Sequence, residues 1–129
     1  MSRPENLKYS PTHEWVRVEG DIAVIGITDH AVEQLSDLAF VDLPEKGTVL
    51  EKDTRFGEIE STKSVSDLIS PVSGEIVGVN TEIVENLQLI SSSPYDQGWM
   101  IKVRMSRPSE VSSLLSAEDY ALQIASEEH

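Results

Sequence analysis

The sequence contains no cysteine, and only seven of its 129 residues are aromatic. Without cysteine the chain can form no disulfide framework, no thiol nucleophile and no cysteine-ligated zinc or iron–sulfur centre. Basic residues are also scarce, because 10 Lys and Arg stand against 23 Asp and Glu and give a formal net charge of −13. We therefore expect no binding to nucleic acid or to an anionic membrane surface, since both require a basic face.

Long hydrophobic runs are absent as well. No apolar segment approaches the roughly 20 residues of a membrane-spanning helix, and residues 1–10 lack the apolar stretch of a secretory signal. A chain of this length suits one folded domain that buries about two-thirds of the surface its unfolded form exposes. We expect a soluble, intracellular protein.

Short apolar segments, separated by proline and glycine, predict a mainly β fold, either a small barrel or a sandwich. Residues 15–18 and 22–27 flank Gly20 and predict a hairpin. Further strands are expected at 38–43, 49–50, 55–61, 65–69, 74–79 and 99–105. A helix is expected at 30–35, capped by Thr28 or Asp29, and a second after the cap Thr81, continuing through Asn86. Two C-terminal helical segments are expected to begin at Pro108 and Ser116. The run from Ser91 to Pro94 is expected to be a loop.

An internal repeat relates residues 44–54 to residues 71–81 at a constant offset of 27. Proline, glycine, an aliphatic pair, Asx and threonine recur in register, which makes six matches in eleven positions. Two copies of one turn-and-strand unit predict two similar half-sheets that face each other. The segment between them can reverse direction only near residues 61–64, where a hairpin tip is expected.

Lys63 lies at this predicted tip, and it is the only basic residue among the 46 from Phe56 to Ile101. Charge pattern alone gives it no special role, because most surface lysines are simply solvated. A catalytic or Schiff-base lysine needs burial or neighbouring cations, which a tip does not offer. An exposed lysine between two strands is instead accessible to acylation by another enzyme.

The sequence around Lys63 resembles the lipoyl attachment region of glycine cleavage system H proteins, through the run Gly57-Glu58-Ile59-Glu60-Ser61-Thr62-Lys63-Ser64-Val65-Ser66-Asp67-Leu68-Ile69-Ser70-Pro71 and onward to Val77. Further blocks resemble the same family at 8–16, 25–31, 40–44, 93–95 and 98–103. These blocks span residues 7 to about 122 in order. Thr62 and Ser64 stand where biotinyl domains carry methionines, and the chain lacks the linkers and catalytic domain of 2-oxo acid dehydrogenase acyltransferases.

The resemblance implies a barrel-sandwich hybrid of the lipoyl/biotinyl type, with short helices and a C-terminal helical tail. Residues 1–129 are expected to form one lipoyl-carrier domain, comprising an N-terminal hairpin segment 7–28, a lipoyl hairpin core 38–80 and a C-terminal strand and helices 99–127. The lipoyl group attached to the lysine, called the arm below, would supply the thiol chemistry that a cysteine-free chain lacks.

The resemblance further implies a non-catalytic carrier with lipoate covalently attached to Lys63. Such a carrier takes an aminomethyl group from the pyridoxal-phosphate glycine decarboxylase (P protein) to the aminomethyltransferase (T protein). Dihydrolipoamide dehydrogenase (L protein) reoxidises it, and a further partner enzyme attaches the lipoate. A monomer is expected, located in the bacterial cytoplasm, or in the mitochondrial matrix for a processed eukaryotic form. The alternative is a lipoyl-relay donor or an interaction scaffold.

Other residues carry weaker predictions. Glu14 and Asp67 are candidates for an anionic cleft that shields the loaded arm, with Thr12 as a neutral hydrogen-bond partner; the alternative for Glu14 is an ordinary solvated side chain. Glu60 and Asp67 flank the lysine and are candidates for recognition by the lipoate-attaching enzyme. No metal site is expected, because His13, His30 and His129 lack paired-ligand spacing. Trp15 and Trp99 are expected to be packing residues.

Two segments depart from the family pattern. Arg55 stands where the family often has glycine, and residues 85–90 replace a loop that commonly contains proline. Neither segment includes the lysine, so the predicted carrier role does not depend on them.

Overall fold

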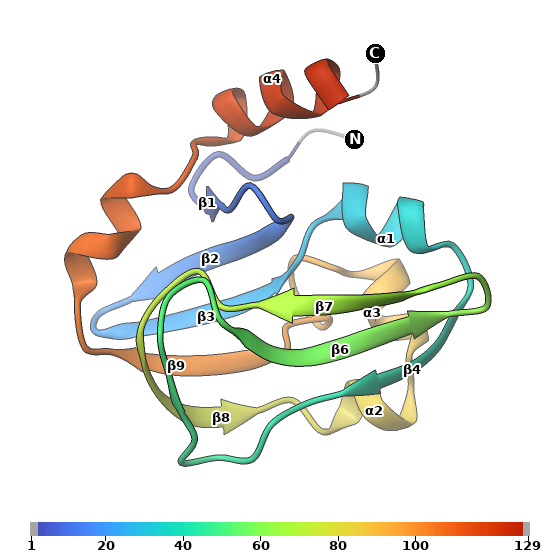
Figure 1. Cartoon of the computed structure of the whole chain (residues 1–129), viewed down its shortest axis with the longest axis horizontal. Helices are drawn as coiled ribbons and strands as arrows, with labels where there is room; N and C mark the ends of the chain where they lie inside the picture. The colour runs from blue at the N-terminus through green and yellow to red at the C-terminus, as the bar shows by residue number, and fades with distance from the viewer. Residues whose placement is uncertain (1–2, 128–129) are drawn as a thin grey trace.

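The computed structural model describes residues 3–127 and is mainly β (Figure 1). The strands are β1 (Lys8–Tyr9), β2 (Glu14–Glu19), β3 (Ile22–Ile27), β4 (Leu38–Asp42), β5 (Val49–Leu50), β6 (Arg55–Ser61), β7 (Val65–Ile69), β8 (Gly74–Val79) and β9 (Ile101–Met105). The helices are α1 (Asp29–Leu35), α2 (Glu82–Glu85), α3 (Gln88–Ser92), the 3₁₀ helix η1 (Pro108–Ser113) and α4 (Ala117–Glu127). No helix within these residues is long and apolar enough to cross a membrane.

Two antiparallel sheets form a barrel-sandwich hybrid. The larger has the strand order β1-β2-β3-β9-β8-β5, and the smaller has the order β4-β6-β7. Strands from all three predicted segments of the chain therefore share the larger sheet. In Figure 1 the hairpin β6–β7 crosses the front of the molecule, and its tip extends to the right beyond the end of α1.

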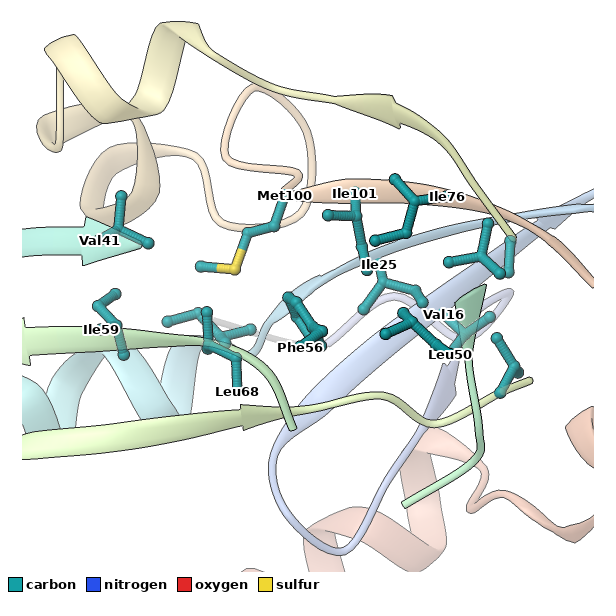
Figure 2. Packing of buried hydrophobic residues seen from close by; sticks show 14 of the residues in the cluster. Val16, Ile25, Val41, Leu50, Phe56, Ile59, Leu68, Ile76, Met100 and Ile101 are labelled. Atoms are coloured by element: carbon teal, nitrogen blue, oxygen red, sulfur yellow. The ribbon is translucent and has the colours of Figure 1, made fainter. Parts of the chain in front are cut away.

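The main core lies between the two sheets (Figure 2). Phe56 and Leu68 of the smaller sheet face Ile25 and Ile76 of the larger one, with Met100 among them, and all five are at most 5 % exposed. In β9 buried residues alternate with more exposed ones, because successive side chains of a strand point to opposite faces. In β3 nearly every residue is buried, because this strand contributes side chains to buried clusters on both faces of the sheet. This core fixes the hairpin β6–β7 against the rest of the protein.

A second buried cluster lies on the outer face of the larger sheet, where α4 and the N-terminal segment cover β2. Trp15 is fully buried there and donates its indole N–H to the carbonyl of Pro94 at 2.9 Å. Tyr120 of α4 stacks on Tyr9 with ring centroids 5.0 Å apart. This cluster anchors α4, although α4 is far from β2 in sequence.

Most of the predicted elements are confirmed. Strands β6, β7 and β8 have the predicted bounds, and Gly20 turns the hairpin β2–β3 with a positive φ of 66°. The Thr28 hydroxyl caps α1 by accepting the N–H of Ala31 at 3.2 Å. The Ser116 hydroxyl likewise accepts the N–H of Asp119 at 3.1 Å, at the start of α4.

Three local predictions are wrong. The loop expected at Ser91 to Pro94 is partly helical, because α3 continues to Ser92 and packs its buried Ile90 into the core. Thr81 precedes α2 as predicted, but its side chain makes no capping hydrogen bond. The last strand begins at Ile101 and not at Trp99. Trp99 is half-buried, and the Lys102 ammonium lies 4.9 Å from the centroid of its ring.

The two copies of the internal repeat do not form half-sheets that face each other. Their strands β5 and β8 pair directly within the larger sheet, with Val49 opposite Glu75 and Leu50 opposite Gly74. The amide of Gly47 also donates to the carbonyl of Ile76 at 2.7 Å. Each short strand leaves backbone groups that need partners, and the two copies satisfy one another.

Candidate functional site

Lys63 lies in the turn between β6 and β7 and is exposed, as predicted. The buried Ser61 organises this turn: its hydroxyl accepts the backbone N–H of Lys63 at 3.2 Å and that of Ser64 at 3.1 Å. The amide of Thr62 donates to the carbonyl of Asp37 at 2.9 Å, which ties the tip to the end of α1. The lysine backbone is thus held on two sides, while its side chain points into solvent.

Ser61 was not singled out from the sequence. Its importance comes from its position at the end of β6, where a hydroxyl can accept the amides of the next residues. Serine before a tight turn often does this, so the local sequence carried a weak signal.

A cavity of about 230 Å³ lies between α1 and the hairpin. Liquid water occupies about 30 Å³ per molecule, so this volume can hold several waters or a small polar group. Twelve residues line it: Thr12, His13, Glu14, Ile27, Ala31, Gln34, Leu35, Ile59, Ser64, Ser66, Asp67 and Leu68. The structure therefore brings together all three predicted cleft residues, Thr12, Glu14 and Asp67. The same cavity is lined by Ser64, the residue that follows Lys63.

Glu14 is only 1 % exposed, so the alternative of a solvated side chain is wrong. Its Oε1 accepts hydrogen bonds from the hydroxyls of Ser10, at 2.7 Å, and of Thr12. Its Oε2 accepts the backbone N–H of Ile69 on β7 at 3.1 Å. Burial raises the pKa of the Glu14 carboxyl to about 7, and these hydrogen bonds oppose that rise only in part.

Asp67 also lines the cavity and is much more accessible than Glu14, with 63 % of its side chain exposed. Its Oδ1 pairs with the Arg55 guanidinium at 3.1 Å, and the same guanidinium lies 3.4 Å from Glu58. Arg55 thus offsets part of the negative charge of Asp67 at the cavity. Glu60, the other recognition candidate, is half-buried on β6 opposite Val65.

Nine of the twelve lining residues were not among the predicted cleft residues, and Gln34 and His13 have the largest polar side chains of these nine. Gln34 reaches the cavity because α1 packs beside the hairpin, which no local pattern indicates. His13 has a positive φ of 76° in the turn before β2, a conformation for which histidine is more tolerant than most residues. Burial lowers the pKa of the His13 imidazole below its usual value.

His13 and His30 lack paired-ligand spacing in the sequence, but the structure brings them together. The rings of His13 and His30 lie 5.0 Å apart between centroids, because α1 returns beside the turn that precedes β2. The Nδ1 atom of His13 is hydrogen-bonded to the Tyr120 hydroxyl of α4 at 2.7 Å. His129 lies outside the described residues.

The fold and the site define a class of protein in which a two-sheet β scaffold presents a single lysine at a hairpin tip beside an acidic cavity. The family model for the glycine cleavage H-protein matches residues 7–127. The chain therefore belongs to the glycine cleavage system H protein family.

Individual relatives agree with this membership. The chain is 52% identical over 121 residues to a glycine cleavage system H protein from Synechococcus sp. (strain JA-2-3B'a(2-13)), which covers 94% of each protein. It is 55% identical over 116 residues to a mitochondrial H protein from Flaveria pringlei, covering 90% of this chain and 72% of the relative. A crystal structure of the H protein from Mycobacterium marinum superimposes with a TM-score of 0.88 at 43% identity, covering 95% of this chain and 99% of the other.

Proposed function

We propose that the chain is the lipoyl-bearing shuttle of the glycine cleavage system and has no catalytic activity of its own. It receives an aminomethyl group at the P protein, delivers it to the T protein and is reoxidised by the L protein. Its compartment is that of these enzymes, the bacterial cytoplasm or the mitochondrial matrix. The observation that carries the proposal is the exposed Lys63 on a hydrogen-bonded hairpin tip within a chain of this family.

The residues at the tip fit a covalently attached lipoyl group. An amide bond requires an accessible amine, and Lys63 is exposed. Lipoate in amide linkage there would supply the disulfide and dithiol chemistry that this cysteine-free chain cannot. Ser61 and the Thr62–Asp37 hydrogen bond hold the backbone, so the attachment point keeps its position when partners change.

Glu14, Asp67 and Thr12 are proposed to shield the cationic amine of the loaded arm inside the cavity. A carboxyl with a pKa near 7 ionises readily when a cation approaches, because the opposite charge favours its anionic form. Ser10 and Thr12 hydroxyls orient the Glu14 carboxyl toward this task. Asp67 contributes less, because its carboxylate is exposed and already paired with Arg55.

Glu60 and Asp67 are also proposed as recognition residues for the lipoate-attaching enzyme. Both lie on the hairpin that carries Lys63, one on each strand, and both are at least partly accessible. An enzyme that approaches the tip would meet both carboxylates.

Glycine–bicarbonate exchange with purified P protein tests the carrier function. We expect the lipoylated chain to support exchange that saturates with carrier concentration, and the unlipoylated chain to give only background exchange. Lipoylated chain that supports no exchange, yet donates its lipoyl group to another apoprotein, would establish the relay alternative in place of the carrier.

The lifetime of the loaded carrier tests the cavity. Glu14→Gln is expected to shorten it roughly tenfold, because a hydrogen bond to a charged group contributes about 1.5 kcal/mol or more. Asp67→Asn is expected to have a smaller effect. Release of the amine, followed after removal of the P protein, is the measurement, and Glu118→Gln on the exposed side of α4 is the charge-matched control. Equal lifetimes in the wild type and in the three variants would eliminate the shielding role.

A further inference from the structure

Three side chains of metal-ligand type meet where the turn before β2, α1 and the end of α4 come together. We call His13, His30 and Glu127 the histidine cluster, and one ligand atom from each lies within 4.8 Å of the other two. His13 and His30 meet because α1 returns beside the turn before β2, and Glu127 joins them because α4 packs on the outer face of the larger sheet (Figure 1). The carrier function proposed above assigns no role to this cluster, although His13 also lines the cavity.

His30 carries an unexplained polar atom. The residue is 7 % exposed, and its Nε2 is buried without a hydrogen-bond partner among residues 3–127. A buried polar atom left unpaired costs free energy, so native structures usually provide it with a partner. A ligand that interacts with imidazole would satisfy this histidine.

The other two side chains are held in position by neighbours. The Nδ1 atom of His13 is hydrogen-bonded to the Tyr120 hydroxyl at 2.7 Å, which leaves Nε2 directed to Glu127 at 3.4 Å from Oε1. The other carboxylate oxygen of Glu127 accepts a hydrogen bond from Gln123 at 2.7 Å. Outer partners of this kind orient the ligands of protein metal sites and select the histidine tautomer.

The Tyr120 hydroxyl also connects His13 to the helix that carries His30. Its hydroxyl lies 2.7 Å from Thr28 Oγ1, and Thr28 caps the helix that carries His30. The nearby guanidinium of Arg3 is paired with Asp29 at 2.9 Å, so its positive charge is largely compensated. Hydrogen bonds thus hold His13 and Glu127 in place, and the ion pair with Asp29 offsets part of the positive charge of Arg3.

We propose that His13, His30 and Glu127 bind one divalent transition-metal ion of the zinc type. Imidazole nitrogen and carboxylate oxygen are ordinary ligands of such ions, and three protein ligands leave a fourth position for water. Ligands about 2.0–2.1 Å from a tetrahedral ion lie about 3.4 Å from one another, as His13 Nε2 and Glu127 Oε1 do. The most distant ligand atoms need a side-chain shift of roughly 1 Å to close on the ion.

An ion at this position fastens the end of α4 to α1 and to the turn before β2. That turn also contains Thr12 and leads directly into Glu14, both of which line the cavity. Metal binding therefore stabilises the wall of the cavity without contacting the hairpin tip.

Zinc titration of the full chain, without a histidine tag and after treatment with EDTA, tests the site. Excess Mg²⁺ is included to occupy surface carboxylates, because Mg²⁺ prefers oxygen ligands and competes poorly for imidazole. We expect one zinc per chain by calorimetry. At zinc 100-fold above its dissociation constant, the melting temperature is expected to rise by roughly 10 °C.

Variants identify the ligands. Glu127→Gln removes an exposed carboxylate without disturbing the core, and it is expected to weaken zinc binding at least tenfold. Glu118→Gln on the same helix is the matched control and should bind as the wild type does. His30→Gln is expected to abolish the stoichiometric site and the rise in melting temperature, and Lys63→Arg to leave both unchanged.

Two results would overturn the proposal. The first is the absence of stoichiometric zinc uptake by the wild-type chain in the presence of Mg²⁺. The second is equal affinity in Glu127→Gln and Glu118→Gln, which would show that any bound zinc lies elsewhere. Because Glu127 is exposed, this comparison remains decisive even when His30→Gln fails to fold. Cobalt absorption provides an independent readout, since its visible spectrum reports nitrogen coordination in the wild type and should weaken in Glu127→Gln.

Discussion

Replacing Lys63 with arginine is expected to abolish lipoylation completely. Arginine preserves the positive charge and the length of the side chain, but its guanidinium remains protonated and cannot form the amide. The side chain is exposed, so the substitution should change the free energy of unfolding by no more than about 0.5 kcal/mol. Loss of modification can then be attributed to loss of the amine.

The measurement is the intact mass of each protein purified from lipoate-supplied cells. Wild-type chain should gain the mass of one lipoyl amide, whereas Lys63→Arg should keep its unmodified mass. Lys46→Arg is the control, because Lys46 is another exposed lysine in a turn. A mass gain in Lys63→Arg would show that lipoate is attached to another residue. A wild type without the mass gain would leave only the scaffold alternative.

The second large effect concerns Glu14 and pH. Its pKa of about 7 in the folded protein lies above the ordinary value of 4.5, so the folded state holds this proton while the unfolded state releases it. The contribution of Glu14 to stability is therefore fully present below pH 4.5 and is lost as pH rises toward 7. The total change is about 3 kcal/mol.

Glu14→Gln removes this pH dependence and retains a group that can hydrogen-bond to Ser10, Thr12 and Ile69. The free energy of unfolding of the variant, minus that of the wild type, is expected to increase by about 3 kcal/mol between pH 4.5 and pH 8. Urea unfolding of both proteins at several pH values measures this difference, which cancels the titration of carboxylates common to both. A difference that stays constant with pH would show that the Glu14 carboxyl titrates normally.

The hairpin β6–β7 shows what local sequence can predict. Its strand bounds and the position of Lys63 follow from short apolar segments and from the polar residues 61–64 between them. Both signals lie within 15 residues of chain, where a strand and its turn are specified mainly by their own side chains. The same is true of the caps at Thr28 and Ser116, which act on amides three residues away.

The helix α3 shows where local signals fail. Its serines favour turns and its length is only five residues, so the sequence predicted a loop across its end. Burial of Ile90 and packing against α1 stabilise the helix in the folded protein. Tertiary packing thus overrides a weak local preference, and no pattern within the segment reveals it.

By itself, the sequence determined the mainly β fold, the hairpin with its single lysine and, through its resemblance, the family. These properties depend on neighbouring residues and on motifs that can be read in order. The burial of Glu14, the cavity that it shares with Asp67 and the meeting of His13, His30 and Glu127 depend on tertiary structure. They arise because the two sheets pack face to face and α4 folds back over β2, which brings distant side chains within hydrogen-bonding distance and removes water from around them.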